Sequence, residues 1–401
     1  MSPTDPDFDP AELALLADPE PVLGQLRDQF PLFQATIGLQ RFWVLSRHED
    51  VKRVLEDPSA LMRPPGASTP PSLGAGPAAR MWKTALSMMD PPDHTRVRRL
   101  VGRAFTRRRA EDLRPGIEAV VDEVFRGLDD RDQIEVVSEL ALQVPMRVIC
   151  GLLGVPDEDW PMLQSWTPDF LRIFLPDAAS LDDRQRLDRA SQNFIEYFGA
   201  MIDARLEAPR EDLTTSLVAL QEEGGMTRDE LIGALRGLLT AGFETSAATI
   251  SAAFLGFGRE PAQLDLLRAR PDLVPQAVEE LLRWESPVRA HLRYLGADMA
   301  LHGRRIPAGA AMWMLVGAAN HDPLRFRDPA RIDIARAEND HLAFGGGRHF
   351  CLGAYLSRVE LQSVFARLAR RWSRIEVVEG TARRRPNFQF PSLERLVVGV
   401  R

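Results

Sequence analysis

The sequence predicts a mainly α-helical protein with small β-sheets. Residues 115–225 read as successive amphipathic helices. From Thr227 onward no proline follows until Pro261, so a single helix can run for about thirty residues, or roughly 45 Å, as a central spine. Strand-like patterns are limited to short segments, found at residues 42–45, after Pro287 and at residues 383–400.

The composition is that of a folded protein with a large core. The 401 residues are 45% hydrophobic, and length alone would suggest two or three domains. Two cysteines cannot form a disulfide framework, so we expect a reducing compartment. The start, MSPTDPDFDPAELA, lacks the features of a signal peptide, and the purest apolar run, residues 310–319, is about half the length needed to cross a bilayer. With a formal charge of −7, these features predict a cytoplasmic protein that binds neither membranes nor nucleic acids.

The ends of the chain and one loop complete the expected elements. Residues 1–40 read as a polar lead followed by a short helix, and residues 51–55 have helical spacing after the strand at 42–45. Proline and glycine concentrate between Met62 and Ala79, which predicts a loop within one domain. Residues 301–316 read as a hairpin around HGRR, and residues 383–400 as a strand pair.

The predicted long helix carries a cap and a row of small residues. Thr227 and Glu230 have the T-x-x-E spacing of a capping box, which starts a helix. Gly233, Gly237 and Ala241 recur every four residues, and such a stripe costs helix stability, about 1 kcal/mol for each interior glycine. Two interpretations stay open. Another helix packs closely against this face, or something flat and rigid lies against it.

Cys351 lies behind consecutive glycines in FGGGRHFCLG and ahead of an amphipathic run. Apolar residues recur after it at three- and four-residue spacing, as on one helix face: Leu352, Tyr355, Leu356, Val359, Phe365, Leu368 and Trp372. Cys351 therefore sits at or just before a helix N-terminus, where free N–H groups and the dipole favour a thiolate. A thiolate with open space before it is a metal ligand or a nucleophile. Cys150, within an apolar run, reads as a small buried hydrophobe.

The spacing F-x-x-G-x-x-x-C-x-G, formed here by Phe344, Gly347, Cys351 and Gly353, resembles the haem-binding signature of the cytochrome P450 family. Four fixed positions of this kind recur by chance in roughly one chain in a thousand of this length. The resemblance implies a P450 fold with a long central helix over a buried haem b. It also implies that the Cys351 thiolate is the axial ligand, whose electron donation favours O–O cleavage.

Further motifs resemble the residues that this family uses to hold haem. His94 and Arg98, in D-P-P-x-H-x-x-x-R, resemble a clamp on the haem propionates, which need cationic or N–H partners when buried. Arg293 takes the place of the second propionate arginine, and His349 could donate to a propionate as well.

Residues 241–245, Ala-Gly-Phe-Glu-Thr, resemble the family's oxygen-activation motif, with Ala241 against the haem. Cleaving O2 needs two protons delivered in a dry pocket. The Thr245 hydroxyl can relay a proton, and the Glu244 carboxylate can turn toward solvent and recharge the relay.

Glu280 and Arg283, at E-x-x-R spacing, would be an ordinary surface pair on a helix taken alone. The resemblance implies instead a buried structural pair that supports the cysteine loop. Arg336 is the expected third member, and Arg331 is the alternative. For the substrate pocket the expected residues are Gly237, Thr240, Val288 and Phe390. Family members often carry a bulky aliphatic residue where this chain has Gly237, so extra volume is expected there. The alternative is that another side chain, from the 165–185 region or Phe390, fills that gap.

The resemblance implies a monooxygenase that inserts one atom of O2 into a bulky apolar small molecule, such as a terpenoid, steroid or polyketide. No flavin or iron–sulfur segment is visible, so electrons are expected from a separate ferredoxin and ferredoxin reductase. A small acidic ferredoxin would suit the arginines of the cysteine side: Arg96, Arg103, Arg107, Arg108, Arg348 and Arg358. Since all motifs serve one cofactor, we expect a single domain over residues 1–401, acting as a monomer.

Two other functions compete with this interpretation. One is a peroxide-driven or non-oxidative haem-thiolate enzyme, and the other is a haem-based ligand sensor. Neither would need the Glu244–Thr245 pair.

Overall fold

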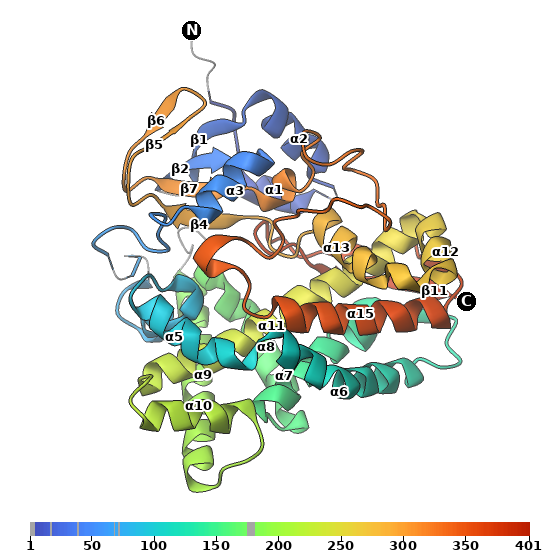
Figure 1. Cartoon of the computed structure of the whole chain (residues 1–401), viewed down its shortest axis with the longest axis horizontal. Coiled ribbons are helices and arrows are strands. Elements are labelled where there is room, and N and C mark those ends of the chain that lie inside the picture. The colour runs from blue at the N-terminus through green and yellow to red at the C-terminus, as the bar shows by residue number, and fades with distance from the viewer. Residues whose placement is uncertain (1–4, 17, 38–39, 68, 71–72, 175–180) are drawn as a thin grey trace.

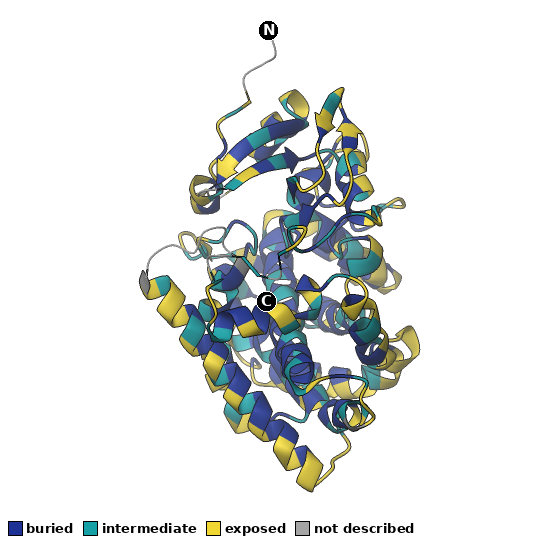
Figure 2. Ribbon diagram, turned by 90° about the vertical axis from the view of Figure 1, so that its left-hand side faces the viewer, coloured by how far each residue is buried: buried dark blue, intermediate teal, exposed yellow. Residues whose placement is uncertain are grey.

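The computed structural model describes residues 5–16, 18–37, 40–67, 69–70, 73–174 and 181–401. The described part is mainly helical with small sheets, which confirms the predicted fold class. In Figure 1 the strands of the largest sheet lie at the top, and most of the helices lie below them. Buried residues concentrate in the interior, while the outward faces of the helices are exposed (Figure 2).

The largest sheet has the strand order β1-β2-β7-β4. Strand β1 (Leu32–Ile37) pairs antiparallel with β2 (Gln40–Leu45), β2 pairs parallel with β7 (Ala311–Met314), and β7 pairs antiparallel with β4 (His291–Tyr294). Side chains from β1, β2 and β7 form one apolar cluster with helices α1 (Pro10–Leu15) and α2 (Glu20–Gln29). The prediction of one short helix in residues 1–40 is therefore incomplete, because two helices and a strand lie there.

The predicted hairpin at residues 301–316 is correct only in its first half. Strands β5 (Met299–Leu301) and β6 (Arg304–Ile306) pair around His302 and Gly303, both of which have positive φ. The following residues instead form β7 in the largest sheet. All four of its side chains are buried, and β7 lies between β2 and β4 inside that sheet.

Helix α11 (Arg228–Arg259) runs through the middle of the molecule (Figure 1). Thr227 and Glu230 form the predicted capping box, with both hydrogen bonds present. Among the described helices, α11 is the one long and apolar enough to cross a membrane, and 67% of its most apolar window is buried inside the protein. It packs against α4 (Pro77–Thr84), α7 (Gln143–Leu153) and α9 (Leu181–Glu207), so it serves as a core helix.

The row of small residues on α11 divides into two parts. A Cβ at Gly233 would lie 2.4 Å from the carbonyl oxygen of Thr84, so close packing against α4 requires that glycine. A Cβ at Gly237, one turn later, would have no neighbouring atom within 4 Å. Close helix packing therefore explains Gly233 but not Gly237.

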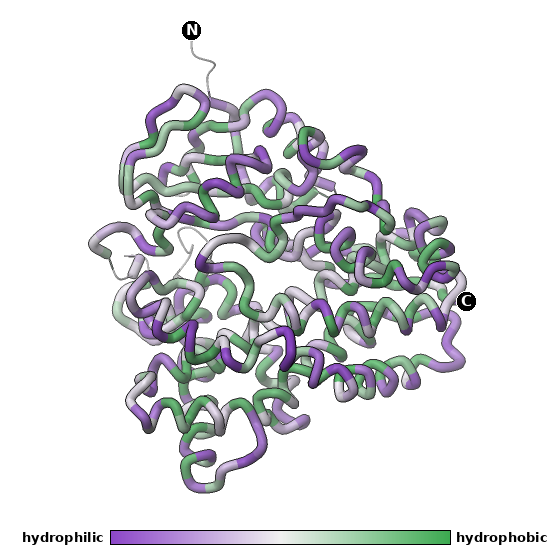
Figure 3. Tube along the Cα trace, in the orientation of Figure 1, coloured by the Kyte–Doolittle hydropathy of each residue, from purple (hydrophilic) through white to green (hydrophobic). Residues whose placement is uncertain are grey.

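Helix α15 (Ala354–Arg371) follows the cysteine and packs lengthwise on α6 (Arg107–Arg126), and both alternate hydrophobic and hydrophilic residues (Figure 3). Most of the predicted apolar face is buried, but Tyr355 is 46% exposed. Tyr355 differs because it lies at the edge of that face, about 100° around the helix from buried Leu356, where it lines a groove between α15 and α6.

The remaining elements frame this helical body. A second sheet has the order β3-β11-β8, and β9 pairs with β10, which confirms a strand pair within residues 383–400. The further helices and strands are α3 (His48–Glu56), α5 (Asp93–Val101), α8 (Trp160–Phe170), α10 (Leu213–Glu222), α12 (Pro261–Ala269), α13 (Val274–Trp284), α14 (Val316–Ala319), β3 (Gln133–Glu135), β8 (Ile375–Val377), β9 (Arg383–Arg384), β10 (Leu393–Arg395) and β11 (Val397–Val400).

Candidate functional site

The cysteine loop is a tight turn held against α3. Gly345 and Gly347 have φ values of +69° and +60°, in the left-handed region that favours glycine. A Cβ at Gly347 would lie 2.4 Å from the carbonyl oxygen of Leu55, so the loop approaches α3 too closely for any side chain there. The backbone N–H of Cys351 donates to the carbonyl oxygen of Phe344 over 2.9 Å and closes the turn. Helix α15 begins three residues later, at Ala354.

The thiol of Cys351 faces an internal space. Its residue has accessible surface, yet burial raises the pKa of the thiol, against the opposing effects of the Gly353 N–H, Arg98 and Arg358. A residue can have accessible surface while its thiol is surrounded by protein if the sulfur borders a hollow within the protein. Ala241 is also exposed, although it lies in the middle of the buried helix α11. The Gly353 N–H lowers the pKa of the thiol, as expected at a helix N-terminus, but burial has the larger effect. A bound metal ion would deprotonate the thiol.

Buried donors without acceptors gather beside this hollow. The rings of His94 and His349 lie 4.1 Å apart between centroids, and the Nε2 atoms of His94, His291 and His349 are buried with no hydrogen-bond partner. Buried donors of this kind normally have partners, so these await an acceptor. Arg293 is buried too, and its Nη1 donates only to the neighbouring carbonyl of Leu292 over 2.8 Å.

The electrostatics of this cluster favour a bound anion. Burial first, and the neighbouring Arg98 second, lower the pKa of His94 to about 4. Burial and then Arg293 lower the pKa of His349 to about 2 and that of His291 to about 3. Burial also lowers the pKa of Arg293 to about 10. Because burial first, and the neighbouring cations second, hold the imidazoles neutral, carboxylates placed among them would gain both charge balance and donors. The residues present therefore fit the two propionates of a haem.

Sequence reasoning missed one residue of this cluster. His291 lies two residues before Arg293 on strand β4, so both side chains project from one face of that strand. A Cβ at Gly345 in the cysteine loop would lie 3.6 Å from the Nε2 atom of His291. The H-x-R alternation in a predicted strand was the available signal.

Glu244 and Thr245 occupy adjacent positions on α11. The hydroxyl of Thr245 donates to the carbonyl oxygen of Ala241 over 2.8 Å, so the hydroxyl oxygen remains free to accept. Burial raises the pKa of Glu244, while Arg385, whose Nη1 lies 3.6 Å from Oε2 of Glu244, opposes that rise. Glu244 is thus an acid held inside the protein with one cationic contact toward the C-terminal strands.

The E-x-x-R pair is a buried cluster. Glu280 and Arg283 are both 0% exposed, and two hydrogen bonds of 2.7 and 2.8 Å join their side chains. Arg336 Nε donates to Glu280 Oε2 over 2.9 Å and is the third member. Arg331 contributes only its carbonyl oxygen, which accepts from Arg283 over 3.1 Å.

Two polar contacts join this cluster to the segment before the cysteine loop. Arg283 donates to the carbonyl of Asn320, and the Asn320 side-chain oxygen accepts from the backbone N–H of Leu342 over 2.8 Å. Next to the cluster, Glu279 contacts His341 at 3.1 Å and Arg358 at 2.7 Å. Helix α13 is therefore tied to both ends of the cysteine loop.

The predicted pocket residues differ in how far they are buried. Gly237 borders open space, and Thr240 is buried, with its hydroxyl donating to the carbonyl oxygen of Arg236 over 3.1 Å. Val288 and Phe390 are half-buried, and their place in a pocket stays a prediction. Of the 165–185 segment, considered a possible filler of the space at Gly237, residues 175–180 lie outside the described residues.

The fold and the residues around Cys351 are those of the class of haem-thiolate enzymes. The cytochrome P450 family model matches residues 18–269 and 256–393, and the chain belongs to the cytochrome P450 family. It is therefore an oxidoreductase of the monooxygenase class with haem b as cofactor.

Relatives and solved structures agree with this membership. The chain is 38% identical over 325 residues to mycinamicin IV hydroxylase/epoxidase of Micromonospora griseorubida, covering 80% of this chain and 79% of that protein. It is 35% identical over 354 residues to vitamin D(3) 25-hydroxylase of Pseudonocardia autotrophica, covering 88% and 85%. The crystal structure of P450BioI, in complex with hexadec-9Z-enoic acid ligated acyl carrier protein, superposes with a TM-score of 0.90 at 30% identity, covering 98% of this chain and 100% of that one.

Proposed function

We propose that this protein inserts one atom of O2 into a bulky apolar small molecule, with electrons from a separate ferredoxin and ferredoxin reductase. The observation that carries the proposal is that Glu244, a half-buried acid whose pKa is raised by burial, lies next to the hydroxyl of Thr245 in the middle of α11. A haem-based sensor or a peroxide-driven enzyme has no use for a proton-delivery pair. When bound, the haem supplies the centre at which O2 is reduced and split.

The chain's own residues would hold the haem and deliver protons. Cys351 would ligate the iron, while His94, Arg98, Arg293 and His349 would neutralise the propionates. Thr245 would hold a hydroxyl toward the reacting oxygen, and Glu244 would replenish the proton from the side of the protein that carries Arg385.

Two observations support the substrate class. The open space at Gly237 can admit a wide molecule beside α11. Two of the relatives are named as hydroxylases of mycinamicin IV and of vitamin D(3). A terpenoid, steroid or polyketide substrate therefore suits this chain.

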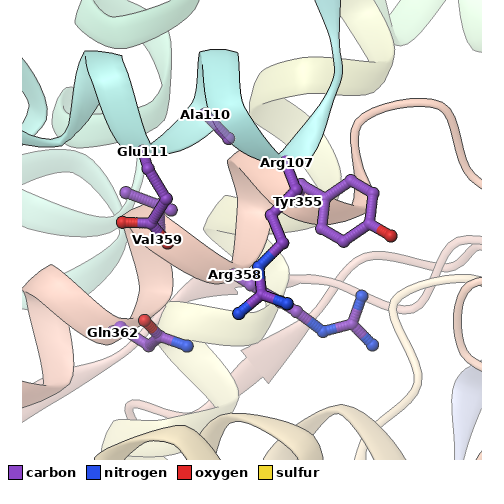
Figure 4. Close-up of a pocket in the computed structure, with 7 residues that line it drawn as sticks. All are labelled: Arg107, Ala110, Glu111, Tyr355, Arg358, Val359 and Gln362. Atoms are coloured by element: carbon purple, nitrogen blue, oxygen red, sulfur yellow. The ribbon is translucent and has the colours of Figure 1, made fainter.

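A groove on the cysteine side supports docking of an electron donor. It lies between α6 and α15 and is lined by Arg107, Glu111, Tyr355 and Arg358, among others (Figure 4). Arg107 is exposed at the groove, and Arg103 and Arg108, close to it in the sequence, are exposed as well. The expected set of docking arginines narrows here, because some of its members have intramolecular partners.

Arg96 pairs with Glu230 through a hydrogen bond of 3.0 Å, and Arg358 pairs with Glu279 at 2.7 Å. Arg348 donates to the carbonyl of Pro58. Arg103, Arg107 and Arg108 are therefore the arginines that we propose for an acidic ferredoxin. We also propose that the protein is a soluble, cytoplasmic monomer of one domain, which agrees with the burial of α11 in the core.

The test measures NADH consumption and product formation with a surrogate ferredoxin and reductase, beside a second reaction with peroxide alone. Product that requires NADH and O2 supports the proposal. Product with peroxide alone would favour the peroxide-driven alternative, and no product in either reaction would favour a sensor. Cys351→Ala is the control for the haem ligand. It should lose the red-shifted Soret band of the reduced carbonyl complex, whereas Cys150→Ala should keep it.

A further inference from the structure

Arg236 is a buried cation without a counter-charge. It lies in the N-terminal third of α11, and its residue is 4% exposed. Among the described residues no carboxylate forms an ion pair with it, and burial alone lowers the pKa of its guanidinium to about 10. An isolated charge in the interior is expensive, so a protein normally retains one only where something neutralises it.

The side chain of Arg236 is oriented but not satisfied. Its guanidinium carbon lies 4.3 Å from the centre of the Phe170 ring, so the cation rests on an aromatic face of helix α8. Its Nη1 reaches only the hydroxyl oxygen of Thr240, over a long 3.5 Å. Its Nε is buried with no partner. A guanidinium has five N–H donors, so most of its hydrogen-bonding capacity is unused.

Two neighbours of this unsatisfied cation belong to the proposed substrate space. Gly237, the next residue, borders an opening with no atom within 4 Å of its Cβ position. Thr240, the residue that Arg236 contacts, is a predicted pocket residue one turn further along α11. An anion entering the space at Gly237 could therefore reach the free N–H groups without displacing another ion pair.

We propose that Arg236 binds a carboxylate of the substrate, so that the natural substrate is a bulky apolar acid. This inference rests on the proposed function and narrows its substrate class. One guanidinium carries a single charge and presents two parallel N–H groups, which matches one carboxylate. A phosphate dianion would call for a second cation, and no other basic group forms part of this site in the described chain.

The experiment compares an acid with its neutral ester in the purified haem-loaded protein. Isothermal titration calorimetry measures the binding of hexadecanoic acid and methyl hexadecanoate, and of a steroid carboxylic acid and its methyl ester. The acids should bind about ten- to a hundredfold more tightly than their esters, as expected for a charge-assisted hydrogen bond. Arg236→Gln should remove that difference and leave the ester affinities unchanged. Arg236→Lys, which keeps the charge but loses the planar fork, should retain part of it.

Equal affinity of wild type for acid and ester would overturn the inference, and that comparison needs no variant. It would also be overturned if Arg236→Gln weakened both ligands equally, or if only an acyl chain on a carrier protein bound. Because this experiment measures binding, a failure of the acid preference is distinguished from a failure of the proposed monooxygenase function, which is measured by turnover. Turnover of neutral substrates with NADH would leave the monooxygenase in place while the acid preference was lost.

Discussion

The Nη1 atom of Arg385 lies 3.6 Å from Oε2 of Glu244, so the C-terminal strand region contacts the middle of α11 at this half-buried acid. Burial raises the pKa of Glu244, and the guanidinium opposes that rise by stabilising the carboxylate. Arg385 thereby influences how readily Glu244 releases and regains a proton. It lies just beyond β9, far from α11 in the sequence.

The first prediction follows from this contact. Arg385→Gln removes the opposing charge, so the pKa of Glu244 should rise further, and less of it will be ionised at neutral pH. The pH at which product yield per NADH changes should move upward in Arg385→Gln, and Glu244→Gln should lack that transition. Glu244→Gln should also slow product formation about a hundredfold.

Arg383→Gln is the matched control, because Arg383 is 64% exposed in its side chain and pairs with exposed Glu394 at 3.5 Å. Its pH profile should equal that of wild type. If Arg385→Gln also left the profile unchanged, the contact would have no part in proton delivery.

The second prediction concerns the Glu280 cluster. Glu280→Gln leaves Arg283 completely buried without its carboxylate and should cost about 3–5 kcal/mol of unfolding free energy. Arg331→Gln should change it by less than about 0.5 kcal/mol, because that side chain is exposed and only its carbonyl takes part. Urea denaturation of both variants measures the difference. Comparable losses in the two variants would contradict the assignment of Arg336 as the third member.

The cluster also has a pH signature. Burial would raise the pKa of Glu280, but Arg283 and Arg336 outweigh it and hold the pKa below its ordinary value of 4.5. Since the folded pKa is lowered, its contribution to stability is present above the ordinary pKa and is lost as the pH falls through the lowered value. Glu280→Gln should therefore show a weaker loss of stability in acid than wild type.

Local signals in the sequence predicted much of this structure. The capping box at Thr227 and the absence of proline up to Pro261 give the extent of α11, because caps and breakers act within a few residues. The spacing around Cys351 gives the loop, because Gly347 has both a positive φ and a close neighbour there. Caps and glycines with positive φ each depend on the residue type at one position, so the sequence alone can reveal them.

Long-range partners could not be predicted in the same way. The choice of Arg336 over Arg331 depends on how the chain folds back over α13, and the parallel pairing of β7 with β2 joins segments far apart in the sequence. Arg96 looked like one of several surface arginines, yet it pairs with Glu230 at the start of α11. Sequence periodicity does not report which cation meets which anion across a fold.

The third prediction tests the docking surface. Turnover with an acidic ferredoxin should fall as salt rises, since charge attraction is screened over about 8 Å at physiological ionic strength. Arg108→Glu should lower turnover about tenfold at low salt by weakening encounter. Arg305→Glu makes the same charge change at an 82% exposed side chain in the β5–β6 hairpin, at the other end of the molecule (Figure 1), and should have little effect. Equal effects of the two variants would point to net charge rather than to a docking site.

The last prediction concerns the space at Gly237. A leucine there would project into an opening with no neighbour within 4 Å of the Cβ position, so Gly237→Leu should fold and gain up to about 1 kcal/mol in helix propensity. Its side chain would occupy the space proposed for a wide substrate. Titrations followed by the haem spin-state shift should therefore show loss of multi-ring ligands and retention of small apolar ones. Gly233→Ala is the contrasting control, because its Cβ would meet the Thr84 carbonyl at 2.4 Å and destabilise the protein without selecting among ligands. If Gly237→Leu bound large and small ligands as wild type does, the opening would not be part of the substrate site.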